Sequence, residues 1–152
     1  MNAVIMGRKT WDSVPERFRP LKGRLNVVLS RSNPAVAWDG SGTDQEPVNL
    51  SSLTTALEGL AQSRDVDRAF VIGGAEIYRT ALQAPETKRI LLTRVLTDFE
   101  CDTSFPINLG EGEAEGWKKK STEALDQWVG ESVPEGEQEE NGIKYVFEMY
   151  ER

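Results

Sequence analysis

Apolar and polar positions follow two periods along the chain, one typical of strands and one typical of helices. Apolar runs bounded by glycine or polar residues predict strands at 2–6, 24–30, 68–74 and 88–100. The second of these runs is apolar enough to be buried on both faces of a sheet. Apolar residues at helical spacing predict helices at 8–13, from Ser51 or Ser52 to about Gln62, and at 75–82.

The remaining segments predict an exposed loop and a C-terminal hairpin. Residues 32–47 are rich in turn-forming residues and predict the loop. The segments "WKKKSTEAL" (117–125) and "GIKYVFEMYER" (142–152) predict two antiparallel strands, joined by an acidic loop at 130–142. Strands alternating with helices, followed by a hairpin, predict an α/β fold with a mainly parallel sheet and an antiparallel edge. No repeat or linker interrupts the pattern, so residues 1–152 are expected to form a single domain.

Composition narrows the chemistry. The chain has no histidine, and Cys101 is its only cysteine. A histidine base and a zinc cluster are therefore not expected, and no other metal site is predicted. A lone cysteine favours a reducing compartment such as the cytoplasm. No apolar run approaches membrane-spanning length, so no membrane partner is expected.

Charge is unevenly distributed. The net charge is −7, yet residues 1–34 carry seven Lys or Arg side chains against Asp12 and Glu16, a local charge of +5. A nucleic-acid-binding protein is usually basic over a whole face, so nucleic acid is not an expected partner. A small anionic ligand fits the local positive charge better.

Three short motifs follow predicted strands directly. They are Gly7-Arg8-Lys9-Thr10, Ser30-Arg31-Ser32 and Gly73-Gly74. Free backbone N–H groups, cationic side chains and hydroxyls suit phosphate, although each motif alone also fits an ordinary turn. Because ligands of parallel sheets collect at the carboxyl ends of the strands, the three motifs are expected to line one edge. The glycine pair does not match the G-x-G-x-x-G dinucleotide pattern.

Six blocks of the sequence resemble dihydrofolate reductase of the eukaryotic type. In chain order they are "VIMGRKTWDSVP", "RPLKGRLNVVLSR", "FVIGGAEIY", "LLTRV", "DFECDTSFP" and "GIKYVFEMYE". The resemblance implies a mostly parallel central sheet with flanking helices and a C-terminal antiparallel hairpin. It also implies NADPH-dependent reduction of dihydrofolate to tetrahydrofolate in one-carbon metabolism, with antifolates as further ligands.

The resemblance also implies site residues. Cofactor contacts would come from Gly7, Arg8, Lys9, Thr10, Leu29, Ser30, Arg31, Ser32, Gly73, Gly74, Ala75, Glu76 and Ile77. Within this set, Ser30-Arg31-Ser32 would take the 2′-phosphate of the adenosine ribose, and the Gly7 motif the other phosphates. Substrate contacts would come from Val14, Pro15, Phe18 and Leu21 around the benzoyl group, Arg24 at the glutamate carboxylate, Ile72 and Tyr78 beside the pterin, and Thr93 in support. The Gly73–Gly74 and Arg19–Pro20 peptides are expected to be cis.

The family normally carries further residues ahead of the position that matches Asn2. They include a central strand, a loop that closes over the nicotinamide, and the carboxylate that anchors the pterin. Without a match to them, no catalytic residue is assigned, impaired activity is expected, and two open sheet edges favour self-association. The alternatives are a related pyrimidinone reductase of riboflavin synthesis and an inactive fragment that binds NADP or self-associates.

Overall fold

The computed structural model describes residues 1–96, 105–107, 109 and 116–152. The chain forms two compact units, Met1–Ala84 and Pro85–Arg152. The predicted strand end at 97–100, together with Cys101, lies outside the described residues. None of the helices in the described part has the length and apolar character needed to span a bilayer.

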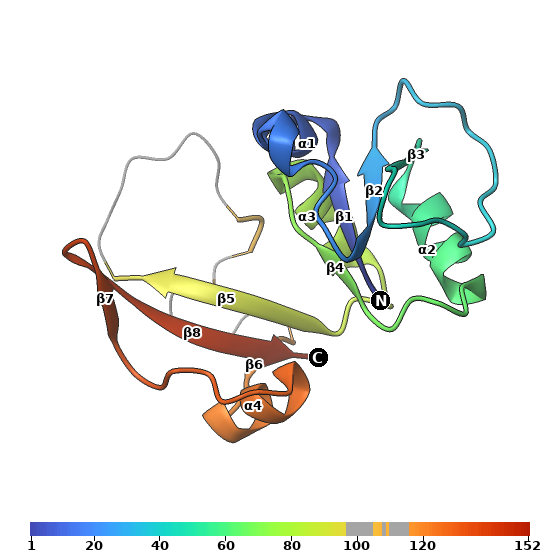
Figure 1. Ribbon diagram of the computed structural model, residues 1–152. Coiled ribbons are helices and arrows are strands. Elements are labelled where there is room, and N and C mark those ends of the chain that lie inside the picture. The colour runs from blue at the N-terminus through green and yellow to red at the C-terminus, as the bar shows by residue number, and fades with distance from the viewer. Residues whose placement is uncertain (97–104, 108, 110–115) are drawn as a thin grey trace. The chain divides into compact units, whose positions relative to one another are not determined.

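The first unit contains a four-stranded sheet in the order β3–β2–β1–β4 (Figure 1). Every pair in it is parallel. The strands are β1 Asn2–Gly7, β2 Arg24–Leu29, β3 Val48–Leu50 and β4 Ala69–Val71. Three of them confirm predicted strands, whereas β3 was not predicted, because three residues are too few to establish a strand period.

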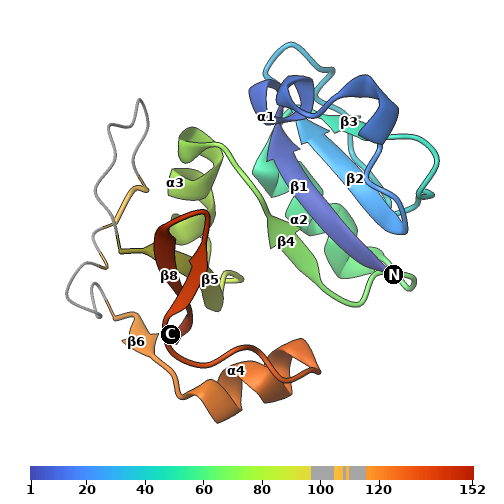
Figure 2. The same ribbon diagram turned by 60° about the vertical axis from the view of Figure 1, so that its left-hand side comes forward.

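Helices cover one face of this sheet (Figure 2). They are α2 Leu53–Gln62 and α3 Ala75–Gln83, and both were predicted. The Ser52 hydroxyl caps α2 by accepting a hydrogen bond from the Thr55 amide at 3.2 Å, which decides between the two candidate caps. The core of this face combines strand and helix residues: Ala3, Ile5, Leu25, Val27, Leu29, Leu50, Leu53, Ala56 and Ala81.

The opposite face of the sheet holds a smaller apolar cluster. Val4, Met6 and Val28 are buried there, with Trp11 and Leu21 packed against them. Trp11 comes from the predicted short helix α1, Arg8–Ser13, and a 3₁₀ turn at Glu16–Phe18 follows it. All residues of β2 after the first are buried, which confirms the predicted burial on both faces.

The second unit is an antiparallel sheet in the order β5–β8–β6, with β7 also paired to β8. Its strands are β5 Arg89–Val95, β6 Lys118–Lys119, β7 Gln138–Glu140 and β8 Ile143–Glu151. A parallel sheet with helices and antiparallel C-terminal strands is the predicted fold class. Within the described residues, β4 and β5 are each an edge strand of their own sheet.

The predicted strand at 117–125 is wrong for most of its length. Only β6 is a strand there, and a helix, α4 Thr122–Val129, follows directly. The helix forms because Ser121 caps it, accepting a hydrogen bond from the Ala124 amide at 3.2 Å, and because Leu125 buries its apolar face. Gly130, with φ 88°, ends it.

The predicted acidic loop is also shorter than expected. Residues 138–140 form β7, which pairs with β8 across a two-residue turn at Asn141-Gly142. Both turn residues have positive φ, 51° and 78°, as the tight hairpin turn of an Asn-Gly pair requires. The hairpin partner of β8 is therefore β7, and β6 pairs with the far end of β8.

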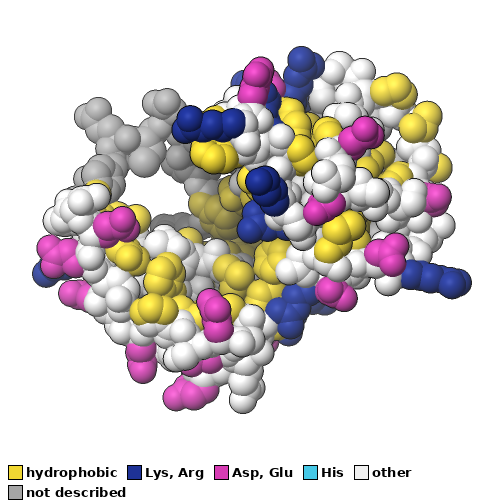
Figure 3. Space-filling model, in the orientation of Figure 1, with side chains coloured by type: hydrophobic (Ala, Val, Ile, Leu, Met, Phe, Trp, Pro, Cys, Tyr) yellow, Lys and Arg dark blue, Asp and Glu magenta, His cyan; other side chains and the backbone are white. Residues whose placement is uncertain are grey.

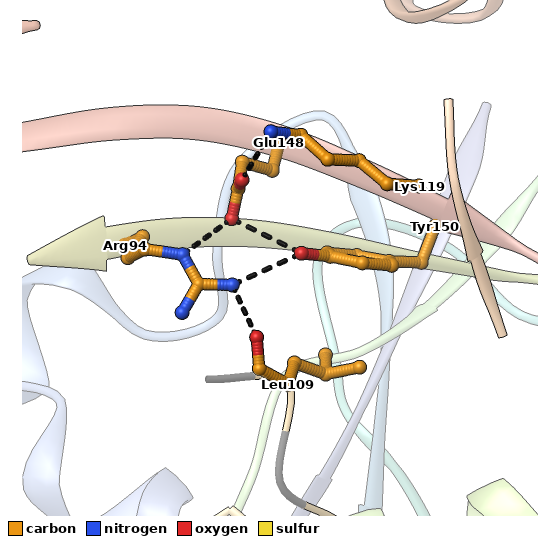
Figure 4. Close-up of polar contacts among 5 residues, drawn as sticks. All are labelled: Arg94, Leu109, Lys119, Glu148 and Tyr150. Carbon is orange, nitrogen blue, oxygen red and sulfur yellow. Dashed lines mark hydrogen bonds and ion pairs between the residues drawn. The ribbon is translucent and has the colours of Figure 1, made fainter. Parts of the chain in front are cut away.

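The buried carboxylate of Glu148 lies at the centre of a group of polar contacts on the second sheet (Figure 4). The Glu148 side chain is 6% exposed, and its two oxygens meet Arg94 Nε at 2.7 Å and Lys119 Nζ at 2.9 Å. Arg94 also donates to the Tyr150 hydroxyl at 3.0 Å and to the Leu109 carbonyl. Burial alone would raise the pKa of Glu148, but the hydrogen bonds from Lys119 and Arg94 hold this pKa below its ordinary value of 4.5.

Candidate functional site

The three predicted motifs lie at one edge of the parallel sheet of the first unit. They follow β1, β2 and β4, which are neighbours in the sheet, and Gly7 and Leu29 are paired in the β1–β2 register. The Gly7 amide donates to the Gly73 carbonyl at 2.9 Å, which joins the first and third motifs directly. Leu29 is buried in the core, so a ligand would meet its backbone rather than its side chain.

Glycines allow the first and third motifs to approach each other closely. A Cβ on Gly73 would lie 3.1 Å from Thr10 Oγ1, and a Cβ on Gly7 would lie 3.2 Å from Ile77 Cγ1. Gly73 has φ +132°, a region that residues with a side chain rarely adopt. The Gly73–Gly74 peptide is cis, as the resemblance implied. The missing side chains therefore let the Gly7 and Gly73 turns pack closely against Ile77 and Thr10.

Hydroxyl and guanidinium groups flank the glycines. Ser30 and Ser32 share a hydrogen bond between their hydroxyls at 2.8 Å, and the Arg31 guanidinium lies beside them in sequence on the same exposed loop. Arg31 also forms an ion pair with Glu76, in the first turn of α3. Guanidinium and hydroxyl donors near the first turn of a helix are groups that bind phosphate. The residues present thus fit the phosphates of a dinucleotide.

Two of the basic residues near the N-terminus, Arg8 and Arg19, form ion pairs with nearby carboxylates. Arg19 lies 3.8 Å from Asp12 and 3.6 Å from Glu16, and its guanidinium stacks 5.2 Å from the Trp11 ring centre. Arg8 also approaches Asp12, at 3.8 Å. On the face shown in Figure 3, basic side chains lie among acidic ones rather than in one patch. Arg19, which precedes the second predicted cis peptide, is thus held by its own loop.

Arg24 occupies the opposite end of the same sheet. It begins β2 and is exposed, whereas Ser30 follows the end of β2. Six residues of extended strand separate the two by roughly 20 Å. The two positions therefore belong to different subsites, which suits two ligands or the two ends of a long one.

Asn26 is a residue of this region that sequence reasoning missed. Its side chain is fully buried and accepts from the Leu21 amide at 2.9 Å. It also donates to the carbonyls of Leu21 and Arg24, at 3.0 and 2.9 Å. The three bonds hold the turn that carries Leu21 and Arg24. A polar residue within the apolar run "RLNVVLS" was the available signal.

The other predicted substrate residues lie in different surroundings. Leu21 and Ile72 pack against the smaller apolar cluster of the first sheet, and Phe18 is 53% exposed. Val14 and Pro15 connect α1 to the 3₁₀ turn. Tyr78 is half-buried, and this burial raises the pKa of its hydroxyl above 10.0. Thr93 belongs to the second unit, on β5 opposite Phe147.

Comparisons with known proteins agree on one family. A model of the family described as dihydrofolate reductase matches residues 1–152. The dihydrofolate reductase of Pneumocystis carinii is 40% identical over all of this chain and 74% of its own length, and that of Gallus gallus is 38% identical over 99% and 72%. The structure of Schistosoma mansoni dihydrofolate reductase matches with a TM-score of 0.72 at 32% identity, covering 99% of this chain and 74% of that one. The chain belongs to the dihydrofolate reductase family.

Proposed function

We propose that this chain binds NADPH in its first unit and serves the reduction of dihydrofolate to tetrahydrofolate in one-carbon metabolism. The family uses NADPH and binds dihydrofolate and antifolates. The observation that supports the proposal best is the meeting of three motifs at one sheet edge, where Gly7, Thr10 and Gly73 touch and Arg31 reaches Glu76. The match to the dihydrofolate reductase family favours this enzyme over the pyrimidinone reductase of riboflavin synthesis.

The cofactor residues have distinct proposed tasks. Bound NADPH supplies the hydride. The Gly7 and Gly73 turns lie against its phosphates, which are held by the Thr10 hydroxyl and the Arg8 and Lys9 charges. Ser30, Arg31 and Ser32 take the 2′-phosphate. Contacts to the pyrophosphate and nicotinamide are assigned to Gly74, Ala75, Glu76 and Ile77. Leu29 is buried, so it is assigned a contact to the cofactor through its backbone alone.

The substrate residues are assigned to both ends of the sheet: Arg24 lies opposite the three motifs, whereas Ile72 and Tyr78 lie beside Gly73. Arg24 pairs in a fork with the glutamate carboxylate of the folate, which needs a planar guanidinium. Apolar contact with the benzoyl and pterin rings comes from Val14, Pro15, Phe18, Leu21, Ile72 and Tyr78. Thr93 is assigned a supporting role at the pterin. Residues 1–152 are proposed to form a single domain.

Turnover by this chain alone is proposed to be low. The predicted substrate residues include apolar, hydroxyl and guanidinium groups but no carboxylate, so the N–H donors of the pterin lack an anionic acceptor among them. Copies of the chain are proposed to associate through β4 and β5, the edge strands named above for the described residues, and light scattering reports such association. A cytoplasmic location is proposed from the single cysteine.

Two measurements test the function. Dihydrofolate-dependent oxidation of NADPH by this chain is expected to be slow but measurable. A complete lack of turnover, with NADPH still bound, favours the inactive NADP-binding alternative. Failure to bind NADPH contradicts the proposed function altogether.

Arg24 offers a residue-level test of the substrate assignment. Arg24→Ala is expected to raise the dissociation constant for folate by about 30-fold to 150-fold, since a paired charged hydrogen bond contributes about 2–3 kcal/mol. Arg24→Lys restores only part of the affinity, because an ammonium group lacks the planar fork. Arg64→Ala, at an exposed position after α2, is the control. Equal affinities for Arg24→Ala and the control contradict the assignment.

A further inference from the structure

Glu76 already holds the guanidinium that is assigned to the phosphate of the cofactor. Its Oε1 lies 2.5 Å from Arg31 Nη2, although the two residues are 45 positions apart in sequence. Both side chains are open to solvent, 87% exposed for Arg31 and 69% for Glu76. The pair is therefore accessible to a soluble ligand.

The position of Glu76 favours a resident negative charge. Glu76 lies in the first turn of α3, directly after the Gly73-Gly74 turn. The positive end of a helix dipole stabilises a carboxylate there, and Arg31 adds a full opposite charge. The carboxylate thus occupies Arg31, which is assigned to the 2′-phosphate, from a position that the helix dipole also favours.

An incoming phosphate therefore meets a competing anion. It must displace Glu76 from Arg31 or share the guanidinium with it. Arg31 has enough N–H donors to contact both groups, but two anions on one guanidinium repel each other at close range. Either route makes binding of the 2′-phosphate weaker than Arg31 alone would allow.

We propose that Glu76 is a specificity-determining residue that competes with the 2′-phosphate for Arg31 and lowers the preference of this chain for NADPH over NADH. The inference rests on the proposed function, because it takes the Ser30-Arg31-Ser32 loop as the 2′-phosphate site. Beside the contact to the pyrophosphate and nicotinamide proposed above, it gives Glu76 a second role as a competitor at Arg31. Removal of its charge improves binding of the phosphorylated cofactor.

The test compares two nucleotides that differ only in the 2′-phosphate. Calorimetric titration with 2′,5′-ADP and with 5′-AMP reports binding without any catalytic turnover. Glu76→Gln is expected to tighten 2′,5′-ADP relative to 5′-AMP by about 1.4-fold to fivefold, the range of an exposed ion pair. The 5′-AMP titration is the reference, because it reports any change at the other cofactor contacts of Glu76. Glu58→Gln on α2 removes the same charge from another exposed helix position and is expected to change neither affinity.

A double-mutant cycle separates competition at Arg31 from general repulsion. If Glu76 acts by occupying Arg31, the gain from Glu76→Gln shrinks in an Arg31→Ala background. An equal gain in both backgrounds overturns competition for Arg31. Unchanged or weakened binding of 2′,5′-ADP in Glu76→Gln also overturns the inference, and weakened binding makes Glu76 a residue that positions Arg31.

The failure of the proposed site has a different signature. If the wild-type chain binds 2′,5′-ADP and 5′-AMP equally, the 2′-phosphate site at Ser30-Arg31-Ser32 is wrong, and the inference is wrong with it. If the wild type prefers 2′,5′-ADP and Glu76→Gln does not alter that preference, only the inference fails.

Discussion

Replacing Asn26 with alanine tests how the fold positions the substrate end of the first unit. The side chain is fully buried and makes three hydrogen bonds to the backbone of Leu21 and Arg24. Each such bond contributes about 1 kcal/mol net, and a buried backbone group left without a partner costs at least as much. Asn26→Ala is therefore expected to lower the free energy of unfolding of the first unit by about 3 kcal/mol.

The assay must report on the first unit alone, because a chain of two compact units need not unfold in one step. Native-state hydrogen exchange of the β1 and β2 amides gives that reading. Asn49→Ala, at an exposed position of β3, is the matched control and is expected to change stability by less than about 0.5 kcal/mol.

The same variant links the fold to binding. Loss of the Asn26 bonds frees the turn that carries Arg24, so the affinity for folate is expected to fall in Asn26→Ala and not in Asn49→Ala. If the two variants exchange amides at the same rate, Asn26 does not hold the turn. If exchange quickens but folate affinity is kept, the turn does not position Arg24.

The remaining predictions concern the ion pairs of Glu148 and one glycine turn. Glu148→Gln should lower the free energy of unfolding by about 2 kcal/mol, because Arg94 and Lys119 lose their charged partner. The control Glu151→Gln, at a more exposed carboxylate, should cost less than about 1 kcal/mol. Equal losses in urea unfolding contradict the proposed role of the Glu148 ion pairs. Since the folded pKa of Glu148 is lowered, its contribution is present above pH 4.5 and is lost as the pH falls through the folded pKa, so wild type and Glu148→Gln should converge in acid. Gly73→Ala should destabilise the first unit by about 1–3 kcal/mol, since φ of Gly73 is +132° and Thr10 is close. The control is Gly74→Ala, whose added Cβ makes only an ordinary 3.8 Å contact with Thr10. Equal melting temperatures of the two variants argue against this backbone geometry.

The parts of the fold that sequence alone predicted are those with a local cause. The apolar run of β2 and the helical spacing of α2 determine their own structure, and both were placed within a residue or two. The helix α4 has local signals as well, with Ser121 before it and Gly130 after it, but the lysine run beside them predicts a strand. The Asn141-Gly142 turn was likewise available as a hairpin signal.

The parts that sequence could not supply depend on contacts between distant residues. The pattern predicted that the motifs share one edge, but it did not give the order β2–β1–β4 that makes them neighbours. The Arg31–Glu76 pair joins residues 45 apart, and no local period encodes it. Asn26 stood out only as a polar residue in an apolar strand, and the identity of its partners required the fold of the turn.

The cofactor site of the first unit can be examined directly by titrating the chain with NADP⁺ and following its backbone amides by NMR. We expect the largest shifts at Gly7, Thr10, Gly73 and the Ser30–Ser32 loop, with little change in the β7–β8 hairpin of the second unit. Saturable binding of NADP⁺ without a change in the chemical shifts of the Gly7 and Gly73 amides would contradict the NADPH site at this sheet edge.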